Sequence, residues 1–163
     1  MKVLLAKSAG FCFGVNKAVN AVCDLLDAGE KVATLGPIIH NPQLVEKLRR
    51  RGVQIVERPE DAEKDAVLVI RSHGVPRAVY EEIERCGVRM YDATCPFVSK
   101  IHRIVSRYSA DGYRVLIAGN AGHPEVMGIC GHCENEATVF ATPEELENLL
   151  KNDHHKKEEL VIM

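Results

Sequence analysis

One local pattern recurs along this chain: a short apolar run, a brief loop, then apolar residues at helical spacing. The runs predict strands at residues 31–35, 53–56, 66–70, 88–91 and 114–118. The helical spacing predicts helices at residues 15–28, 42–51, 76–86 and 96–110. Strands that alternate with helices in this way predict an α/β fold, in which parallel sheets carry helices on their faces.

Individual signals add detail to this pattern. The run at 66–70 is wholly apolar, which is typical of a central strand in a parallel sheet. Asn41 followed by Pro42 predicts a capped helix start, and Thr142 followed by Pro143 predicts another. The remaining patterns predict a buried first strand at 3–6, a helix start at 124–128, a strand at 138–140, a charged loop at 152–159 and a strand from 160.

The number of strands indicates two small parallel-sheet units, each of three layers, rather than one large sheet. The boundary falls near Cys95 and Pro96, so we expect a first unit at residues 1–95 and a second at 96–163. The sequence ends on the apolar run 160–163, and a terminal strand needs a partner. We therefore expect the second unit to be incomplete, with its last strand unpaired and apolar surface exposed.

Composition excludes several classes of function. The 163 residues are 46% hydrophobic and 27% charged, carry a formal net charge of −2, and include no Trp. A nucleic-acid partner is not expected, because both the basic surface and the aromatic platforms are missing. No membrane partner is expected either, since no segment approaches about 20 apolar residues. Without a signal-peptide pattern the chain is expected in the cytoplasm, where cysteines bind metals, catalyse or fill cores.

Five residues share one position in the repeating pattern, directly after an apolar run and before a helix. They are Cys12, His40, His73, Cys95 and His123. In parallel α/β sheets these junctions lie at the carboxyl edge, where ligands bind. We therefore expect two thiols and three imidazoles to converge, which suggests a metal or cluster site beside an anion site.

Each of these residues can also be explained by a purely structural role. Cys12 lies between Gly10 and Gly14, either as a thiolate stabilised by the following helix or as a packed loop cysteine. Cys95 stands at the start of a helix opened by Pro96, so the two cysteines are topologically equivalent. That equivalence favours a shared functional role for both.

The three histidines and Glu125 can likewise be explained by a structural role or by a functional one. A single histidine before a helix is commonly a turn or cap residue, but three at matching junctions favour a phosphate site. Glu125 either stabilises the first helical turn or donates protons beside a bound anion.

The other cysteines and histidines receive less weight. Cys23 and Cys86 fall at apolar helix positions and are expected in the core. Cys130 and Cys133 form a CxxC motif, which is either a redox dithiol or a loop with two incidental thiols. The histidines expected at the surface are His102, His132, His154 and His155.

Five motifs occur in a fixed order: GFCFGV at 10–15, GPIIHNP at 36–42, SHGV at 72–75, DATCP at 92–96 and GHPEV at 122–126. Together they resemble the 4-hydroxy-3-methylbut-2-enyl diphosphate reductase family of the non-mevalonate isoprenoid pathway. The resemblance implies three α/β units around a central [4Fe–4S] cluster with one open iron, each unit supplying one cysteine. It assigns Cys12 and Cys95 to the cluster.

The same resemblance implies roles for the other residues. It makes His40, His73 and His123 the diphosphate-binding residues and Glu125 the proton relay of an oxidoreductase. This enzyme would remove the allylic hydroxyl of 4-hydroxy-3-methylbut-2-enyl diphosphate, giving isopentenyl and dimethylallyl diphosphate. A ferredoxin or flavodoxin type protein would donate the electrons.

The family's chains are longer, and their third cluster cysteine falls beyond residue 163. We therefore expect this chain to act as part of a longer protein and to be inactive alone. Two other functions remain open. One is a non-catalytic α/β module that binds diphosphates; the other is a dithiol oxidoreductase that uses Cys130 and Cys133.

Overall fold

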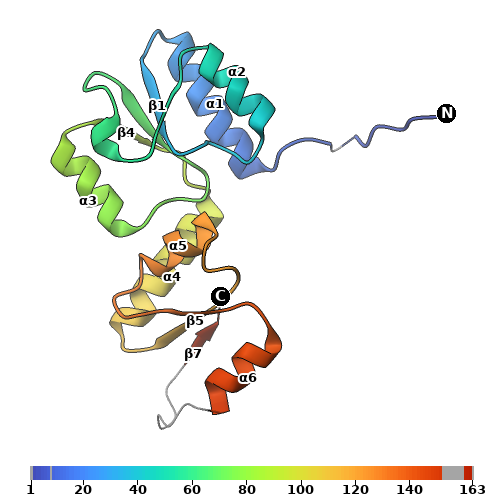
Figure 1. Cartoon of the computed structure of the whole chain (residues 1–163), viewed down its shortest axis with the longest axis vertical. Helices are drawn as coiled ribbons and strands as arrows, with labels where there is room; N and C mark the ends of the chain where they lie inside the picture. The colour runs from blue at the N-terminus through green and yellow to red at the C-terminus, as the bar shows by residue number, and fades with distance from the viewer. Residues whose placement is uncertain (1, 8, 152–159, 163) are drawn as a thin grey trace.

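The computed structural model describes residues 2–7, 9–151 and 160–162 (Figure 1). Its strands form two parallel sheets, one with the order β2-β1-β3-β4 and the other β6-β5-β7. The first sheet and its helices comprise α1 (Phe13–Asp27), β1 (Val32–Leu35), α2 (Pro42–Arg50), β2 (Gln54–Val56), the 3₁₀ turn η1 (Pro59–Asp61), β3 (Val67–Ile70), α3 (Arg77–Cys86) and β4 (Arg89–Asp92). The second comprises α4 (Pro96–Ala110), β5 (Arg114–Ala118), α5 (Pro124–Cys130), β6 (Thr138–Phe140), α6 (Pro143–Lys151) and β7 (Leu160–Ile162). The predicted α/β architecture with parallel sheets is confirmed.

Helices cover both faces of the first sheet, because its central strands are apolar on both sides. Val32 and Val69 pack in a core with residues of α1 and α2, whereas Leu68 and Ile70 face a second core that includes Ile83 of α3. All four residues of β3 are buried, which confirms the central strand predicted from its unbroken apolar run.

The second sheet is built around β5. Val115 and Ile117 of this strand pack with Val105 of α4 and with Val126 and Ile129 of α5. The prediction that the last strand would be unpaired is wrong: β7 pairs in parallel with β5, on the side opposite β6. A central strand has two hydrogen-bonding edges, and β5 uses both. The loop predicted at 152–159 lies outside the described residues.

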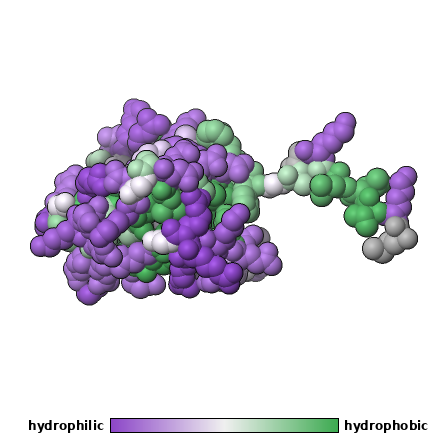
Figure 2. Space-filling view, turned by 90° about the horizontal axis from the view of Figure 1, so that it is seen from above, coloured by the Kyte–Doolittle hydropathy of each residue, from purple (hydrophilic) through white to green (hydrophobic). Residues whose placement is uncertain are grey.

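The strand predicted at residues 3–6 is also absent. Val3, Leu4 and Leu5 are 76%, 81% and 88% exposed, and the segment projects from the body of the molecule (Figures 1 and 2). A strand is stabilised by hydrogen bonds to a neighbour, and none of the described strands lies beside this segment. Its apolar composition predicted burial, but the described residues provide no partner.

The helix ends follow local chemistry. The Asn41 side chain accepts a hydrogen bond from the Leu44 backbone N–H at 3.0 Å, with Pro42 in the first helical turn. Thr142 accepts one from the Glu145 N–H at 3.2 Å. Both predicted helix starts are therefore confirmed. None of the helices in the described part of the chain combines the length and apolar character needed to cross a membrane.

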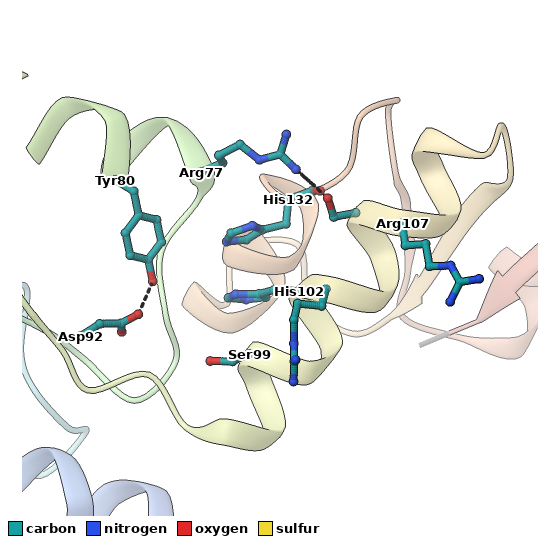
Figure 3. Close-up of a pocket in the computed structure, with 9 residues that line it drawn as sticks. Arg77, Tyr80, Asp92, Ser99, His102, Arg107 and His132 are labelled. Carbon is teal, nitrogen blue, oxygen red and sulfur yellow. Dashed lines mark hydrogen bonds between the residues drawn. The ribbon is translucent and has the colours of Figure 1, made fainter. Parts of the chain in front are cut away.

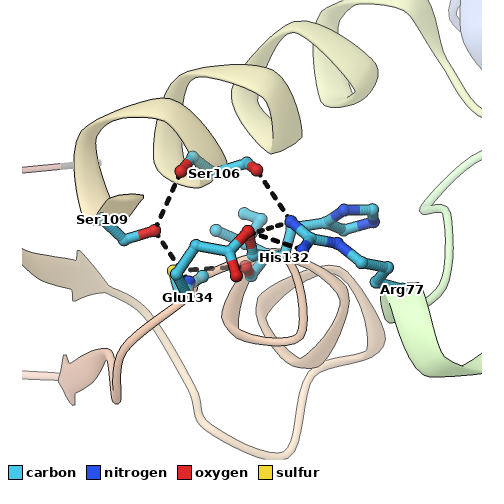
Figure 4. Close-up of polar contacts among 7 residues, drawn as sticks. Arg77, Ser106, Ser109, His132 and Glu134 are labelled. Carbon is cyan, nitrogen blue, oxygen red and sulfur yellow. Dashed lines mark hydrogen bonds and ion pairs between the residues drawn. The ribbon is translucent and has the colours of Figure 1, made fainter. Parts of the chain in front are cut away.

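The two sheets meet where residues 73–77 pack against α5 and the residues that follow it. A Cβ added at Gly131 would lie 2.8 Å from Pro76 Cα, so the backbones approach closely only because Gly131 has no side chain. The Arg77 backbone N–H donates to the Gly131 carbonyl at 3.2 Å. The Arg77 guanidinium also reaches Ser106 at 2.8 Å and Glu134 at 2.6 Å (Figure 4). We call this contact the seam.

We predict that Gly131→Ala destabilises the protein, whereas Gly128→Ala does not. The Gly131 backbone has φ of −70°, which alanine adopts freely, so the cost is the steric clash with Pro76, about 1–3 kcal/mol. A Cβ at Gly128 would meet its nearest neighbours at 3.5 Å, an ordinary contact, and alanine raises helix propensity. Urea unfolding of both variants measures the difference. Equal stabilities would contradict the close backbone contact at the seam.

Candidate functional site

Three histidines from three separate segments converge at the edge where the strands end. His40 lies in the loop after β1, His73 in the turn after β3, and His123 at the N-cap of α5, after β5. The centroids of their rings are 5.1, 5.6 and 6.0 Å apart. The structure therefore brings together all three imidazoles that the sequence placed at equivalent junctions.

The three rings offer ligand atoms within 4.8 Å of one another. His123 Nδ1 accepts a hydrogen bond from the Glu125 backbone N–H at 3.2 Å. In the neutral ring this assigns the proton to Nε2, which is then a donor for an anion. The Glu125 residue itself occupies the first turn of α5, directly after the junction.

His73 is neutral at physiological pH. Burial, together with the nearby charges of His40, Arg71 and His123, lowers its pKa to about 4. Its Nδ1 atom is buried and has no hydrogen-bond partner. A bound anion would oppose these effects, because negative charge beside an imidazole favours the protonated form.

Arg71 adds a positive charge that the sequence analysis did not single out. It follows β3 directly, two residues before His73, and a Cβ added at Gly36 would lie 2.8 Å from its Nη1 atom. Its Nε atom is buried without a partner, and burial lowers its pKa. A cation held this way favours an anion nearby. Arg71 could have been found from the sequence, because it lies between the apolar strand run at 67–70 and His73.

The two cysteines singled out in the sequence each precede a helix, and the first turn of one helix packs against the other cysteine. Cys12 is the N-cap of α1 and Cys95 the N-cap of α4, and neither side chain makes a capping hydrogen bond. A Cβ added at Gly14, two residues after Cys12, would lie 2.7 Å from Cys95 Sγ. The glycine therefore leaves room for the Cys95 sulfur against the first turn of α1. Two uncommitted thiols at helix N-termini suit a metal or an iron–sulfur cluster.

Backbone hydrogen bonds join the cysteine and histidine segments. The Cys95 N–H donates to the Ser72 carbonyl at 2.9 Å, and the Ala93 N–H donates to the Ile70 carbonyl at 3.1 Å. These bonds continue the pairing of β3 with β4 beyond the strands. The cysteine that opens α4 is thereby tied to the turn that carries His73.

The remaining cysteines lie elsewhere. Cys23 packs against the core, as predicted, but the prediction for Cys86 is wrong: it is exposed, at the last residue of α3. Cys130 and Cys133 lie at and just after the C-terminal end of α5. Burial raises the pKa of both thiols, that of Cys133 to about 11. A reactive dithiol needs the opposite shift, so this environment argues against a redox CxxC motif.

Two of the histidines expected at the surface are not there. His102 is only 5% exposed, and its ring stacks on that of His132 at a centroid distance of 4.0 Å (Figure 3). His102 shares the buried face of α4 with Val98 and Val105, four residues before and three after. That helical spacing was the signal that the prediction overlooked. His154 and His155 lie outside the described residues.

Comparison with known proteins identifies relatives of this chain. The family model described as LytB protein matches residues 3–163. The 4-hydroxy-3-methylbut-2-enyl diphosphate reductase of Caldanaerobacter subterraneus subsp. tengcongensis is 44% identical over 153 residues, covering 91% of this chain and 53% of the relative. The reductase of the same name from Clostridioides difficile is 41% identical over 150 residues, covering 91% and 54%. The chain thus spans about half the length of the curated relatives it matches.

Solved structures give the same result. One, of (E)-4-hydroxy-3-methyl-but-2-enyl diphosphate reductase, matches with a TM-score of 0.79 and 38% identity, covering 99% of this chain and 57% of the other. A Plasmodium falciparum reductase structure matches with a TM-score of 0.87 at 23% identity, covering 96% and 49%. At that identity the second likeness concerns the fold alone.

We predict that the protein loses stability as the pH falls from 6.5 toward 4. Burial lowers the pKa values of His73 and His102 to about 4. Between the two pH values the unfolded chain binds protons that the folded chain does not, so unfolding becomes more favourable. Each histidine contributes at most about 1.4 kcal/mol per pH unit, and its contribution is fully present above pH 6.5. Urea unfolding between pH 7.5 and 4.5 measures the slope.

His102→Gln is the matched variant for this prediction, since it removes one of the two buried imidazoles. Its pH slope should be shallower than that of the unaltered protein. An identical slope in both proteins would show that His102 titrates normally when folded.

Proposed function

Because this chain belongs to the LytB protein family, we propose that it supplies part of the active site of a 4-hydroxy-3-methylbut-2-enyl diphosphate reductase. The reaction removes the allylic hydroxyl group with two electrons and yields isopentenyl and dimethylallyl diphosphate. The observation that carries the proposal is the convergence of three imidazoles, together with the position of the Cys95 sulfur against the first turn of the helix that Cys12 caps. Activity and substrate are proposals, since the chain covers about half of its relatives.

The histidine cluster binds the diphosphate in this proposal. His123 donates through Nε2, because its Nδ1 already accepts from the backbone. His40 and His73 face the same space from the first unit. Arg71 contributes positive charge, and a diphosphate would raise the pKa of His73 by offsetting the effects that lower it. Binding is therefore expected to take up a proton.

The thiols of Cys12 and Cys95 would hold the [4Fe–4S] cluster that the family uses. The donor set fits, because both thiols are free of capping bonds and Gly14 leaves space beside Cys95 Sγ. When bound, such a cluster supplies electrons and an iron that acts as a Lewis acid toward the hydroxyl oxygen. The chain supplies two cysteines of the three that the resemblance implies.

Glu125 is the proposed proton donor to the departing hydroxyl group. It follows His123 by two residues, in the first turn of α5. It therefore lies at the same helix end as His123, a proposed diphosphate-binding residue. Exposed apolar side chains follow both cysteines in the sequence: Phe13 is 65% and Phe97 72% exposed. Once covered, such residues would exclude water from the reacting atoms.

The proposal includes the organisation of the whole enzyme. Residues 1–95 and 96–163 form two of three α/β units, each contributing to the cluster or the diphosphate site. The electron donor is a ferredoxin or flavodoxin type protein, and the compartment is the cytoplasm. All six cysteines are free thiols, which is consistent with a reducing environment.

One observation favours a second, simpler function. The three histidines of the anion site all belong to this chain, whereas only two junction cysteines do. The chain alone could therefore act as a diphosphate-binding module without iron.

We predict that the chain alone binds inorganic pyrophosphate and that His73→Ala weakens this binding by about 10- to 100-fold. A hydrogen bond to a charged group contributes about 1.5–3 kcal/mol. Calorimetry on the iron-free chain measures the affinity. Cys86→Ser is the control, because Cys86 is exposed at the far end of α3 and should leave the affinity unchanged. No binding by the unaltered chain would refute the anion site.

We predict that the chain alone, reconstituted anaerobically with iron and sulfide, holds only a labile cluster and does not turn over the allylic diphosphate. Two thiolates leave two irons of the cube without a cysteine ligand. Cys95→Ser should abolish the visible thiolate-to-iron absorption, whereas Cys86→Ser should retain it. Turnover at the rate of a complete reductase, or equal iron content in both variants, would disprove the ligand assignment.

A further inference from the structure

We propose that His102, in the middle of α4, is a positioning residue whose ring sets the spacing between His73 and His123. It is not itself a proposed ligand of the diphosphate or the iron–sulfur cluster, and acts through the two segments that carry those histidines. As a role in ligand binding the inference rests on the proposed function. As a statement about the spacing of the three histidines, the inference can be tested independently of the proposed function.

On one side, the His102 ring packs against the turn that carries His73. A Cβ added at Gly74 would lie 2.6 Å from His102 Cε1. Gly74 also has a left-handed backbone, with φ of +69°, which glycine adopts without strain. The ring therefore rests directly on the backbone next to His73, with no side chain between them.

On the other side, the same ring faces α5. Gly128 lies five residues after His123, and a Cβ added there would be 3.5 Å from His102 Nε2 and 3.5 Å from the His73 carbonyl oxygen. The ring nitrogen, the His73 carbonyl and the α5 backbone thus meet around one point. The ring therefore borders the place where the turn meets α5 and packs against both segments.

His132 joins this contact through its own ring. Its ring stacks on that of His102, with 19° between the ring planes, and its Nε2 lies 3.0 Å from the Val75 carbonyl oxygen (Figure 3). Its own carbonyl accepts from the Arg77 guanidinium at 3.2 Å. The two stacked rings therefore contact successive residues of the turn, Gly74 and Val75, and hold it against the seam.

The charge state of His102 suits this role. It is neutral at physiological pH because burial and the charge of His132 both disfavour its protonated form. Its Nε2 has no hydrogen-bond partner, although buried polar atoms nearly always have one. A side chain that bears this cost is held in place by the packing around it. Binding sites need such fixed supports, because small displacements of ligand groups cost affinity.

The test compares His102→Ala with the control Arg103→Ala. Arg103 is the next residue on α4, and both side chains line a cavity of about 520 Å³. Two quantities are measured on the full chain, the first at neutral pH and the second by a titration that extends below neutral pH. One is the affinity for inorganic pyrophosphate, by calorimetry. The other is the pKa of the His73 imidazole, by NMR titration. A role limited to global stability would leave the His73 pKa unchanged while the protein remains folded.

We expect His102→Ala to bind pyrophosphate about tenfold or more weakly, because the histidines no longer hold one spacing. The pKa of His73 should rise from about 4 toward its ordinary 6.5 as burial and the neighbouring imidazoles recede. Arg103→Ala should change neither quantity. Unchanged affinity and an unchanged His73 pKa in folded His102→Ala would overturn the inference.

A second variant keeps the test decisive if His102→Ala does not fold. His132→Ala removes the stacking partner, which is only half-buried, and should produce the same changes at smaller size. If the unaltered chain fails to bind pyrophosphate, the proposed function fails. The His73 titration still decides the positioning role in that case, so the two failures can be told apart.

Discussion

The close contact at the seam determines most of what this structure can do. The histidines come from both units, so their spacing depends on how the turn after β3 packs against α5. Glycines allow that packing, because a side chain at Gly131 would clash with Pro76 and one at Gly74 would clash with the ring of His102. At these two glycines the contact is between backbone and a rigid ring, which leaves little freedom to repack. The spacing of the histidines depends on this contact.

The unsatisfied polar atoms mark the same region. Among the described residues, three buried side-chain atoms have no hydrogen-bond partner: Arg71 Nε, His73 Nδ1 and His102 Nε2. Two belong to the proposed anion site and the third to the residue proposed to position it. Unpaired buried groups cost folding free energy, so their concentration at one place suggests that the region is arranged for a ligand rather than for stability. The unpartnered Nδ1 atom of His73 and Nε atom of Arg71 are consistent with an anion nearby.

The thiol site depends on a different kind of constraint. Cys12 and Cys95 each open a helix, and the missing side chain of Gly14 lets the Cys95 sulfur lie against α1. Backbone bonds from Cys95 to the turn before His73 then join this site to the anion site. The proposed substrate, with a diphosphate at one end and a hydroxyl group at the other, matches two proposed sites joined in this way.

The sequence by itself determined the elements and their junctions. The wholly apolar run of β3 placed it inside a sheet, and Asn41 capped α2 as predicted, because such signals depend on neighbours along the chain. It also singled out Cys12, Cys95 and the three histidines, and the histidines lie together because parallel strands end at one edge. Tertiary structure decided the rest. The segment at 3–6 lacks a strand partner among the described residues, β7 found one in β5, and His102 is buried under Gly74. Pairing and burial depend on residues distant in sequence, which no local pattern specifies.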